Sequence, residues 1–426
     1  MADGGQTTRP PAGPRALIGW CLFDWANSGF PTIIATFVFS AYFARAVAAD
    51  EVSGTAYWGW ATSASALAVA LFAPVMGAIA DRSGRRKSWL VPLSALCIAA
   101  TAMLWFTKPD PAYALFGLVG FAVANFAFES SMVFYNAMLP DLVPPRLLGR
   151  LSGWGWGLGY AGGLCCLAIA FAGFAMPETP WFGLDKAQAE HIRATAVLVA
   201  VWYAVFMVPF LAWTPDRGGE RIPWAEAVRK GFSTLFGTLR DLRRHGNIAR
   251  FLLARMIYND GLTTLFAFGG IYATGTFGME FQELILFGIA LNVTAGLGAT
   301  AFAWIDDWIG SKPTILISIT GLGILGFLLL LVDSKTWFWI LALPLGIFMG
   351  PAQSASRSLM ARLAPEGLRT EMFGLFAFSG KATAFLGPAV LGWATLAFGG
   401  QRAGMATILV FFGVGAILLL PVRDPR

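Results

Sequence analysis

Long apolar runs joined by short charged turns are the feature that most constrains this chain. A helix of about 20 residues crosses the ~30 Å hydrocarbon core of a bilayer, and the runs here are about 20–27 residues long. Charged residues make up only 13% of the 426 residues, against about 25% in soluble domains. The pattern predicts an all-α polytopic membrane protein and excludes a β-barrel, whose segments alternate over about ten residues.

The apolar runs predict twelve transmembrane helices. Their expected ranges are 16–44, 56–80, 88–106, 112–139, 150–175, 193–214, 249–275, 282–304, 313–332, 336–361, 371–397 and 403–421. This order divides the chain into a tail over 1–15, a six-helix bundle over 16–214, a linker over 215–248, a second six-helix bundle over 249–421 and a tail over 422–426.

A charged turn recurs once in each predicted half. In the first copy Asp81 is followed three residues later by Gly84 and then by Arg85. The second copy, over 303–312, repeats the order of acid, glycine and base and closes on Lys312. We therefore predict two six-helix pseudo-repeats with a binding site between them, and a gating role for these turns.

Lysine and arginine are distributed unequally between the two sets of loops. One set, which includes both tails and the linker, holds 21 of the 30 bases, and the opposite set holds 6. The positive-inside rule then places both termini and the linker in the cytoplasm, and we expect the membrane to be a bacterial inner membrane. The net charge of +6 is interpreted as this topology signal, so no nucleic-acid partner is predicted.

The linker contains apolar residues at helical spacing, flanked by bases. The apolar positions are Trp224, Val228, Phe232, Leu235, Leu239 and Leu242. An amphipathic helix on the inner leaflet, with its bases near lipid head groups, is one interpretation. A solvated connector is the other.

Polar and ionisable residues inside the predicted spans are the candidates for a site, because such groups are costly in a membrane. The candidates for a substrate or proton site are Asp24, Asn27, Glu129, Asn136, Asn259, Asp260, Arg357 and Lys381. Asp24 shares a helix face with Asn27, Ser28 and Pro31, and a polar stripe of this kind lines a cavity or a helix contact.

Each of these candidates has a structural alternative. Asp24 can serve a hydrogen bond between helices, and Glu129 an ion pair without a role in coupling. Arg357 can extend to the interface or help to close an inner gate. A lysine at the depth of Lys381 needs an acid, and Asp24, Glu129 and Asp260 are the available partners. The pair can exchange partners during transport or be permanent.

Residue patterns of enzymes and cofactor sites are absent from the sequence. It contains no H-E-x-x-H, no G-x-S-x-G with partners and no glycine-rich nucleotide loop, so neither an enzyme nor a cofactor is predicted. The four cysteines lie inside apolar runs and the two histidines near the ends of predicted spans. Neither set predicts a disulfide framework or a metal site.

The stretch 77–87 resembles the cytoplasmic signature of the major facilitator superfamily (MFS) between spans 2 and 3. A closer resemblance, to the vacuole-effluxer branch that includes the autophagy-related effluxer of fungi, is carried by 23–28, 134–141, 258–261 and 356–358. The resemblance implies the MFS fold, secondary transport and a monomer, and the best-known member is linked to amino-acid export. It also implies that Asp81 contacts span 11 and steadies the outward-facing state. The second turn departs from the signature, since Ala303 replaces a glycine.

Together these features predict a secondary active transporter that works by alternating access. Acids in the first half and bases in the second suit a zwitterion, so amino acids or short peptides are the favoured solutes. Protons are the expected coupling ion and sodium the alternative, and membrane lipids are expected partners. An exporter of lipids, drugs or organic anions, or a non-transporting membrane sensor or scaffold, remains the alternative.

Overall fold

Regular structure in this chain is helical because a lipid-facing segment must pair its backbone N–H and C=O groups internally. The computed structural model describes residues 11–83, 85–216 and 245–425, with six further positions between 226 and 237. Every regular element within these described residues is a helix.

The first half of the chain forms six membrane segments. The first is built from α1 (Pro14–Asn27), the π-helix η1 (Phe30–Phe37), α2 (Phe39–Tyr42) and the π-helix η2 (Phe43–Val47). The others are α3 (Glu51–Ser83), α4 (Lys87–Met103) with η3 (Leu104–Phe106), η4 (Pro111–Tyr113) with α5 (Ala114–Leu142), η5 (Pro145–Leu147) with α6 (Leu148–Ala170) and η6 (Phe171–Ala175), and α7 (Glu190–Trp213). A short turn, η7 (Trp181–Gly183), precedes α7.

The second half follows the same order with one interruption. Its helices are α9 (Gly246–Phe277), α10 (Phe281–Ile309), α11 (Ser311–Leu331), α12 (Lys335–Leu363), α13 (Arg369–Lys381), α14 (Leu386–Phe398) and α15 (Gln401–Leu419). α13 and α14 together occupy the span expected over 371–397.

Eleven segments among the described residues are long and apolar enough to cross a membrane. α9 has 32 residues, which corresponds to ~48 Å of helix, but it is less apolar because it carries Arg250, Arg255 and Asp260. It occupies the position of the predicted span 249–275. The predicted all-α polytopic membrane fold is confirmed.

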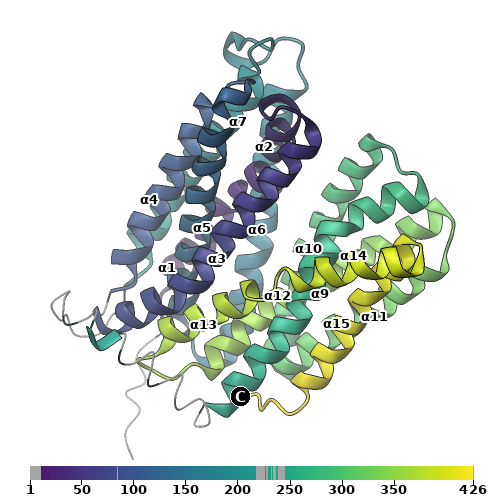
Figure 1. Ribbon diagram of the computed structural model, residues 1–426. Coiled ribbons are helices and arrows are strands. Elements are labelled where there is room, and N and C mark those ends of the chain that lie inside the picture. The colour runs from purple at the N-terminus through teal and green to yellow at the C-terminus, as the bar shows by residue number, and fades with distance from the viewer. Residues whose placement is uncertain are drawn as a thin grey trace, which may run out of the picture.

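The two halves of the chain form two groups of helices that diverge toward one end. Figure 1 shows the purple-to-teal helices of the first half and the green-to-yellow helices of the second meeting at the bottom and separating at the top. The strongest packing between the halves is α3 against α13 and α6 against α10 and α12. These helices form the contact around which the halves are arranged.

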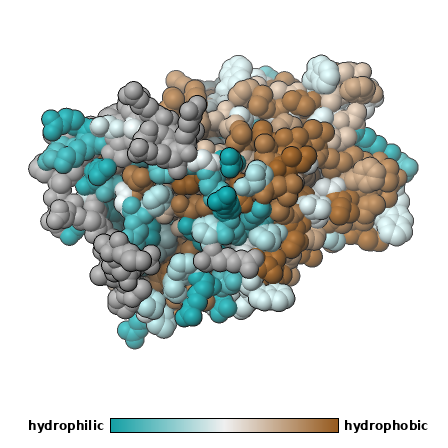
Figure 2. All heavy atoms as spheres, turned by 90° about the horizontal axis from the view of Figure 1, so that it is seen from below, coloured by the Kyte–Doolittle hydropathy of each residue, from teal (hydrophilic) through white to brown (hydrophobic). Residues whose placement is uncertain are grey.

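The end at which the halves meet is also the end where the first and last described residues lie. The backbone N–H of Ala12 donates to Leu142 O at the end of α5, and Asn247 at the start of α9 bonds to Arg423 beyond α15. We call this the linker end, because the segment that joins α7 to α9 starts and finishes there. Seen from this end, polar side chains gather near the middle of the face and hydrophobic ones cover the right-hand side (Figure 2).

The predicted linker over 215–248, with its six apolar helix positions, lies largely outside the described residues. Among the positions that are described, Lys230 forms an ion pair of 2.7 Å with Glu226. The amphipathic helix and the division of the chain into domains at this linker remain predictions.

Two glycines allow α3 and α13 to touch through their backbones at the linker end. A Cβ atom at Gly77 would lie 2.4 Å from Thr370 O, and one at Gly374 would lie 2.6 Å from Ala73 O. Small residues are the usual means of close helix approach in membranes. The contact between the halves therefore depends on these positions having no side chain.

We expect Gly374→Val to lower the melting temperature of the purified protein by several degrees. Overpacking costs about 1–3 kcal/mol, and 1 kcal/mol corresponds to about 2–4 °C in a domain of 150–250 residues. Gly392→Val on α14 is the matched control, since a Cβ there meets no atom within 4 Å. Fluorescence-monitored thermal unfolding measures both variants, and equal melting temperatures would contradict the packing argument.

Candidate transport site

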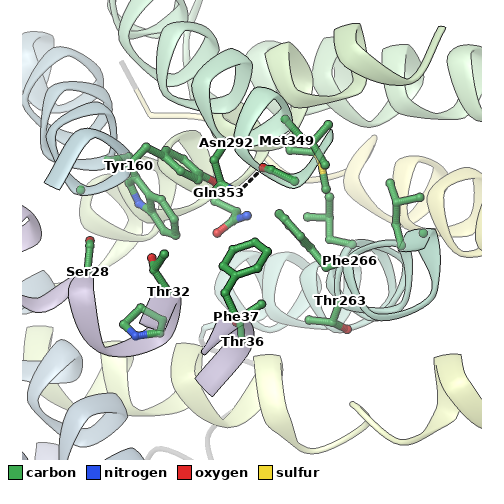
Figure 3. Close-up of a pocket in the computed structure, with 18 of the residues that line it drawn as sticks. Ser28, Thr32, Thr36, Phe37, Tyr160, Thr263, Phe266, Asn292, Met349 and Gln353 are labelled. Atoms are coloured by element: carbon green, nitrogen blue, oxygen red, sulfur yellow. Dashed lines mark hydrogen bonds between the residues drawn. The ribbon is translucent and has the colours of Figure 1, made fainter. Parts of the chain in front are cut away.

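A cavity of about 1020 Å³ lies between the two halves. Side chains from η1, α6, α9, α10 and α12 converge on it, among them Phe37, Tyr160, Phe266 and Gln353 (Figure 3). It extends from Asp24 and Arg357 in its depth to residues near the end opposite the linker. Those residues are Arg45 on η2 and Ile192 at the start of α7.

The change of helix type in the first span positions part of this wall. Pro31 lacks a backbone N–H and cannot continue an α-helical ladder. The chain winds as a π-helix from Phe30 to Phe37, and Pro31, Thr32, Thr36 and Phe37 all line the cavity. Single π-helical turns often occur at functional sites.

Seven of the eight predicted site residues line this one cavity. They are Asp24, Asn27, Glu129, Asn136, Asn259, Arg357 and Lys381. The helix face predicted for Asp24, Asn27, Ser28 and Pro31 faces the cavity as a unit. The sequence thus identified which membrane positions turn inward, while their role in binding remains a prediction.

Asp24 and Arg357 form an ion pair across the two halves. Arg357 Nη1 lies 3.0 Å from Asp24 Oδ2, and the side chains are only 2% and 8% exposed respectively. The Tyr135 hydroxyl donates to the same oxygen at 2.9 Å. Arg357 also donates from Nε to Ser152 Oγ at 2.9 Å and from Nη2 to Ser152 O at 2.7 Å. Arg357 is thus anchored inside the protein and does not extend to the interface.

Aromatic rings enclose the Arg357 guanidinium. It lies 4.9 Å from the Trp20 ring, 5.6 Å from the Tyr135 ring and 5.7 Å from the Trp156 ring. Trp20 and Tyr135 stack with their centroids 4.4 Å apart. Such rings attract a cation through their π faces. The guanidinium and Asp24 therefore share a buried, preorganised site.

Glu129 and Lys381 form a second ion pair across the halves. Lys381 Nζ donates to Glu129 Oε1 at 2.7 Å, and each side chain is 27% exposed. Of the three acids considered for Lys381, the structure selects Glu129. This pair is therefore more exposed to the cavity than the Asp24–Arg357 pair.

The amide residues of the cavity make weaker contacts. Asn136 Oδ1 accepts from Arg357 Nη1 at 3.3 Å, and Asn259 Nδ2 donates to Gly380 O at 3.3 Å. Asn27 Nδ2 lies 3.6 Å from the Met132 sulfur. Long bonds of this kind leave the amides able to turn toward a solute.

Asp260 does not line the cavity, so the expectation that it faces the solute path is wrong. It follows Asn259 directly, and successive helical residues point about 100° apart. Its side chain is 0% exposed on the side of α9 that packs against α14 and α15. Gly387 of α14 lies so close that a Cβ atom there would be 3.0 Å from Asp260 O.

The first charged turn joins the halves at the linker end. Asp81 accepts from the backbone N–H groups of Thr370 at 3.0 Å and Glu371 at 2.8 Å, in the first turn of α13. A carboxylate is favourable at the positive end of a helix. Asp141, at the end of α5, pairs with both Arg86 and Arg369. Arg85 is exposed, and Gly84 lies outside the described residues.

The second charged turn makes the corresponding contact from the second half to the first. Asp307, at the end of α10, accepts from the backbone N–H of Arg150 at 3.1 Å and pairs with its side chain at 3.3 Å. Lys312 Nζ donates to Leu420 O at 2.6 Å, and its N–H to Asp424 at 2.9 Å. In the first half, Lys87 likewise donates from Nζ to Leu211 O and from its backbone N–H to Asp216. The two turns are equivalent in structure although the second lacks a glycine at Ala303.

Several residues of the site were not singled out from the sequence. Among them are Tyr135 and Ser152, which both bind the Asp24–Arg357 pair. Tyr135 falls in the resembling stretch 134–141, which was the available signal. Within the described residues no group of three His, Cys, Asp or Glu could hold a metal ion.

We expect Asp24→Asn and Arg357→Met each to lower the melting temperature more than the two changes together. Removing one partner of a buried ion pair leaves an uncompensated charge and costs about 3–5 kcal/mol, whereas removing both avoids that cost. A double-mutant cycle of melting temperatures measures the coupling. Effects that simply add would show that the pair contributes nothing as a pair.

Comparison with known proteins places these features in one family. A family model described as "Vacuole effluxer Atg22 like" matches residues 12–426. The "Uncharacterized MFS-type transporter YxiO" of Bacillus subtilis is 26% identical over 409 residues, covering 95% of this chain and 94% of that protein. "Autophagy-related protein 22" of Yarrowia lipolytica is 25% identical over 273 residues, 57% of this chain and 45% of that protein.

A solved structure shares the fold. The MFS transporter FucP in its outward conformation superposes with a TM-score of 0.70 at 14% identity, covering 97% of this chain and 99% of that one. At this identity the likeness concerns the fold alone. With the family model spanning nearly all of the chain, the protein is an integral membrane protein of the Atg22-like vacuole effluxer family, an MFS-type transporter.

Proposed function

We propose that this transporter moves a small polar or zwitterionic solute, an amino acid or short peptide by preference, through alternating access. The observation that carries the proposal is the pair of ion bridges, Asp24–Arg357 and Glu129–Lys381, that join the two halves inside one cavity. A charged solute that binds there competes for the same groups that hold the halves together. Binding and conformation are then linked.

The more exposed pair is the proposed solute site. A zwitterion has an ammonium group that suits Glu129 and a carboxylate that suits Lys381, and charge-assisted hydrogen bonds to both would replace the 2.7 Å bond between them. Asn136 of α5 and Asn259 of α9 line the same cavity and can donate to or accept from the solute backbone. The cavity volume of about 1020 Å³ accommodates a solute of this size with water.

The direction of the opening gives the state of the transport cycle. The linker end is closed by the contacts of Asp81, Asp141 and Asp307, and the cavity extends to the opposite end. With the linker and both termini in the cytoplasm of a bacterial cell, as the distribution of bases predicts, this is an outward-facing state. Opening inward then requires these contacts and the Asp24–Arg357 pair to separate.

Protons are the proposed coupling ion, with Glu129 as one acceptor. The cavity gives Glu129 access to water from the open end. Protonation removes the charge that holds Lys381, so a proton and a solute ammonium act on the same bond. Exchange between them would connect proton movement to solute movement without a separate pathway.

The apolar part of the cavity favours a second candidate within transport. Phe37, Phe128, Trp156 and Phe266 contribute large ring surfaces to the walls. Such walls, with Lys381 and Arg357 beyond them, also suit an amphiphilic organic anion. An exporter of drugs, lipids or organic anions is therefore the runner-up, and a sensor without transport would show neither activity.

We expect wild-type protein in liposomes to accumulate labelled amino acids in counterflow, with uptake that follows an imposed pH gradient. Glu129→Gln and Lys381→Gln should each reduce uptake at least tenfold, because a lost charged contact costs about 1.5–3 kcal/mol. Glu178→Gln is the control, since Glu178 is an exposed acid in the loop before α7.

Three other outcomes of that assay separate the alternatives. No amino-acid uptake by folded protein, with uptake of organic anions instead, would favour the runner-up. No transport of any solute class would favour the sensor. Normal uptake by both charge variants would reject the proposed solute site.

Asp81, Arg85, Gly84 and Lys312 are proposed to gate the linker end, and Asp81 provides the sharpest test. We expect Asp81→Asn to weaken the contact of α3 with α13 and to populate the inward-open state. With the native cysteines replaced, a cysteine at Gln353 in the cavity should then react at least two-fold more slowly with an impermeant maleimide added outside. Glu178→Gln, which removes the charge of an exposed acid in the loop before α7, should leave the rate unchanged. A rate that Asp81→Asn does not alter would argue against gating.

A further inference from the structure

Asp260 stands out among the charged groups within the membrane because no base accompanies it. Its carboxylate is completely buried, and neither oxygen has a hydrogen-bond partner in the described structure. The other acids of the cavity region, Asp24 and Glu129, are each paired with a base. A bare carboxylate in a dry, low-dielectric environment is strongly unfavourable, so it must be neutralised by a cation.

The bases on the neighbouring helices are all committed elsewhere. Arg255, one turn earlier on α9, donates to Phe376 O and Ser379 Oγ and covers the Phe376 ring. Lys381 of α13 holds Glu129, and Arg357 and Arg362 of α12 hold Asp24 and Asp306. The remaining bases on the helices packed against α9 lie near helix ends: Arg369 of α13 with Asp141, Arg402 of α15 with Asp333, and Lys335 of α12 with Glu283. The remaining acids also lie near helix ends: Glu371 in the first turn of α13, and Asp307 of α10, which pairs with Arg150. α14 contains no charged residue.

Two further buried oxygens without partners belong to the segments around Asp260. The hydroxyl of Thr383 approaches it without completing a hydrogen bond of normal length. The Thr264 hydroxyl, one turn along α9, is buried and also lacks a partner. Gly387 brings α14 against this corner, since a Cβ there would lie 2.0 Å from Thr264 Oγ1. A single proton can satisfy only one of these groups, whereas a metal cation attracts them all.

The same corner contains a break in the helical ladder. α13 ends at Lys381 and α14 begins at Leu386. Pro388 has no N–H to give to the carbonyl of Ala384, which frees an oxygen in the turn. The carboxyl-terminal end of α13 carries partial negative charge. Unwound carbonyls and half-helix ends of this kind coordinate cations in membrane transporters.

We propose that Asp260, Thr264, Thr383 and the turn 382–385 form a binding site for a monovalent cation, distinct from the solute cavity. The proposal rests on the transport function proposed above, because it assigns the site to the coupling ion. Asn259 and Gly380 connect the two places: they bond to each other and line the cavity, while Asp260 and the turn follow them directly. A cation that orders the turn thereby fixes the position of Lys381, which ends α13.

Thermal unfolding of purified full-length protein in detergent tests the site without any solute. The probes are sodium chloride against choline chloride at equal ionic strength, and pH in sodium-free buffer. A cation at ~100 times its Kd stabilises the folded state alone, so we expect sodium to raise the melting temperature by several degrees. Asp260→Asn should abolish the shift, Thr264→Val and Thr383→Val should raise the apparent Kd about tenfold, and Glu178→Gln should change nothing.

The same measurements distinguish sodium from a proton as the cation that occupies the site. If protons occupy the site, sodium has no effect and the wild-type melting temperature falls as the pH rises, because the folded protein alone holds the proton; this fall is absent in Asp260→Asn. Should Asp260→Asn not fold, binding of radioactive sodium is compared between wild type and Thr383→Val to test for sodium at the site. The melting temperature of Asp260→Glu, which keeps a carboxyl, is then measured against pH to test for a proton. A wild type that responds to neither cation, or an Asp260→Asn variant that responds like wild type, overturns the proposal.

This site and the proposed function can fail independently. Cation binding that depends on Asp260, in a protein that transports no amino acid, would keep the site and reject the solute. Amino-acid uptake with the same sodium and pH dependence in wild type and Asp260→Asn would keep the function and reject the site.

Discussion

The low dielectric of the membrane interior is the constraint on which the rest of this structure depends. A charge placed there needs an opposite charge at bonding distance. In this chain the acids Asp24 and Glu129 lie in the first half and their bases Arg357 and Lys381 in the second. Neither of these two acids is paired with a base of its own half, so the halves are joined by ion pairs through the centre of the molecule.

At the linker end the two halves are joined by carboxylates that cap helices, and there the contacts made by the two halves are equivalent. Asp81 caps α13 and Asp307 caps the start of α6, each reaching from a helix of one half to a helix of the other. The bonds of Lys87 and Lys312 to the ends of α7 and α15 repeat this symmetry. The linker end is thus symmetric, while the two ion pairs of the cavity are polarised, with both acids in the first half and both bases in the second.

The helix ranges and the inward-facing positions could be predicted from hydropathy and residue spacing. The partner of each charged side chain could not, because it depends on how the helices pack. Helix ranges followed from hydropathy because the bilayer sets segment length and pairs the backbone within each segment. Helix-face spacing also predicted correctly that Asp24, Asn27 and Glu129 face the interior of the protein. The partner of Lys381 could not be chosen, since three acids lay at similar depth. Asp260 was misplaced because a shift of one residue turns a side chain from the cavity toward α14 and α15.

The break between α13 and α14 shows why the unpredicted details concentrate at one place. A continuous helix would have been the default for an apolar run from 371 to 397, and Pro388 was its only warning. The break ends α13 at Lys381, whose carbonyl accepts from the N–H of Ala384 in the turn at 3.3 Å. A turn of this kind is easier to rearrange than a helix interior. Lys381, the base that bridges the halves, therefore lies at the start of the one mid-membrane stretch of this span that departs from α-helical geometry. The unpaired acid Asp260 of α9 lies against the same stretch, next to Thr383.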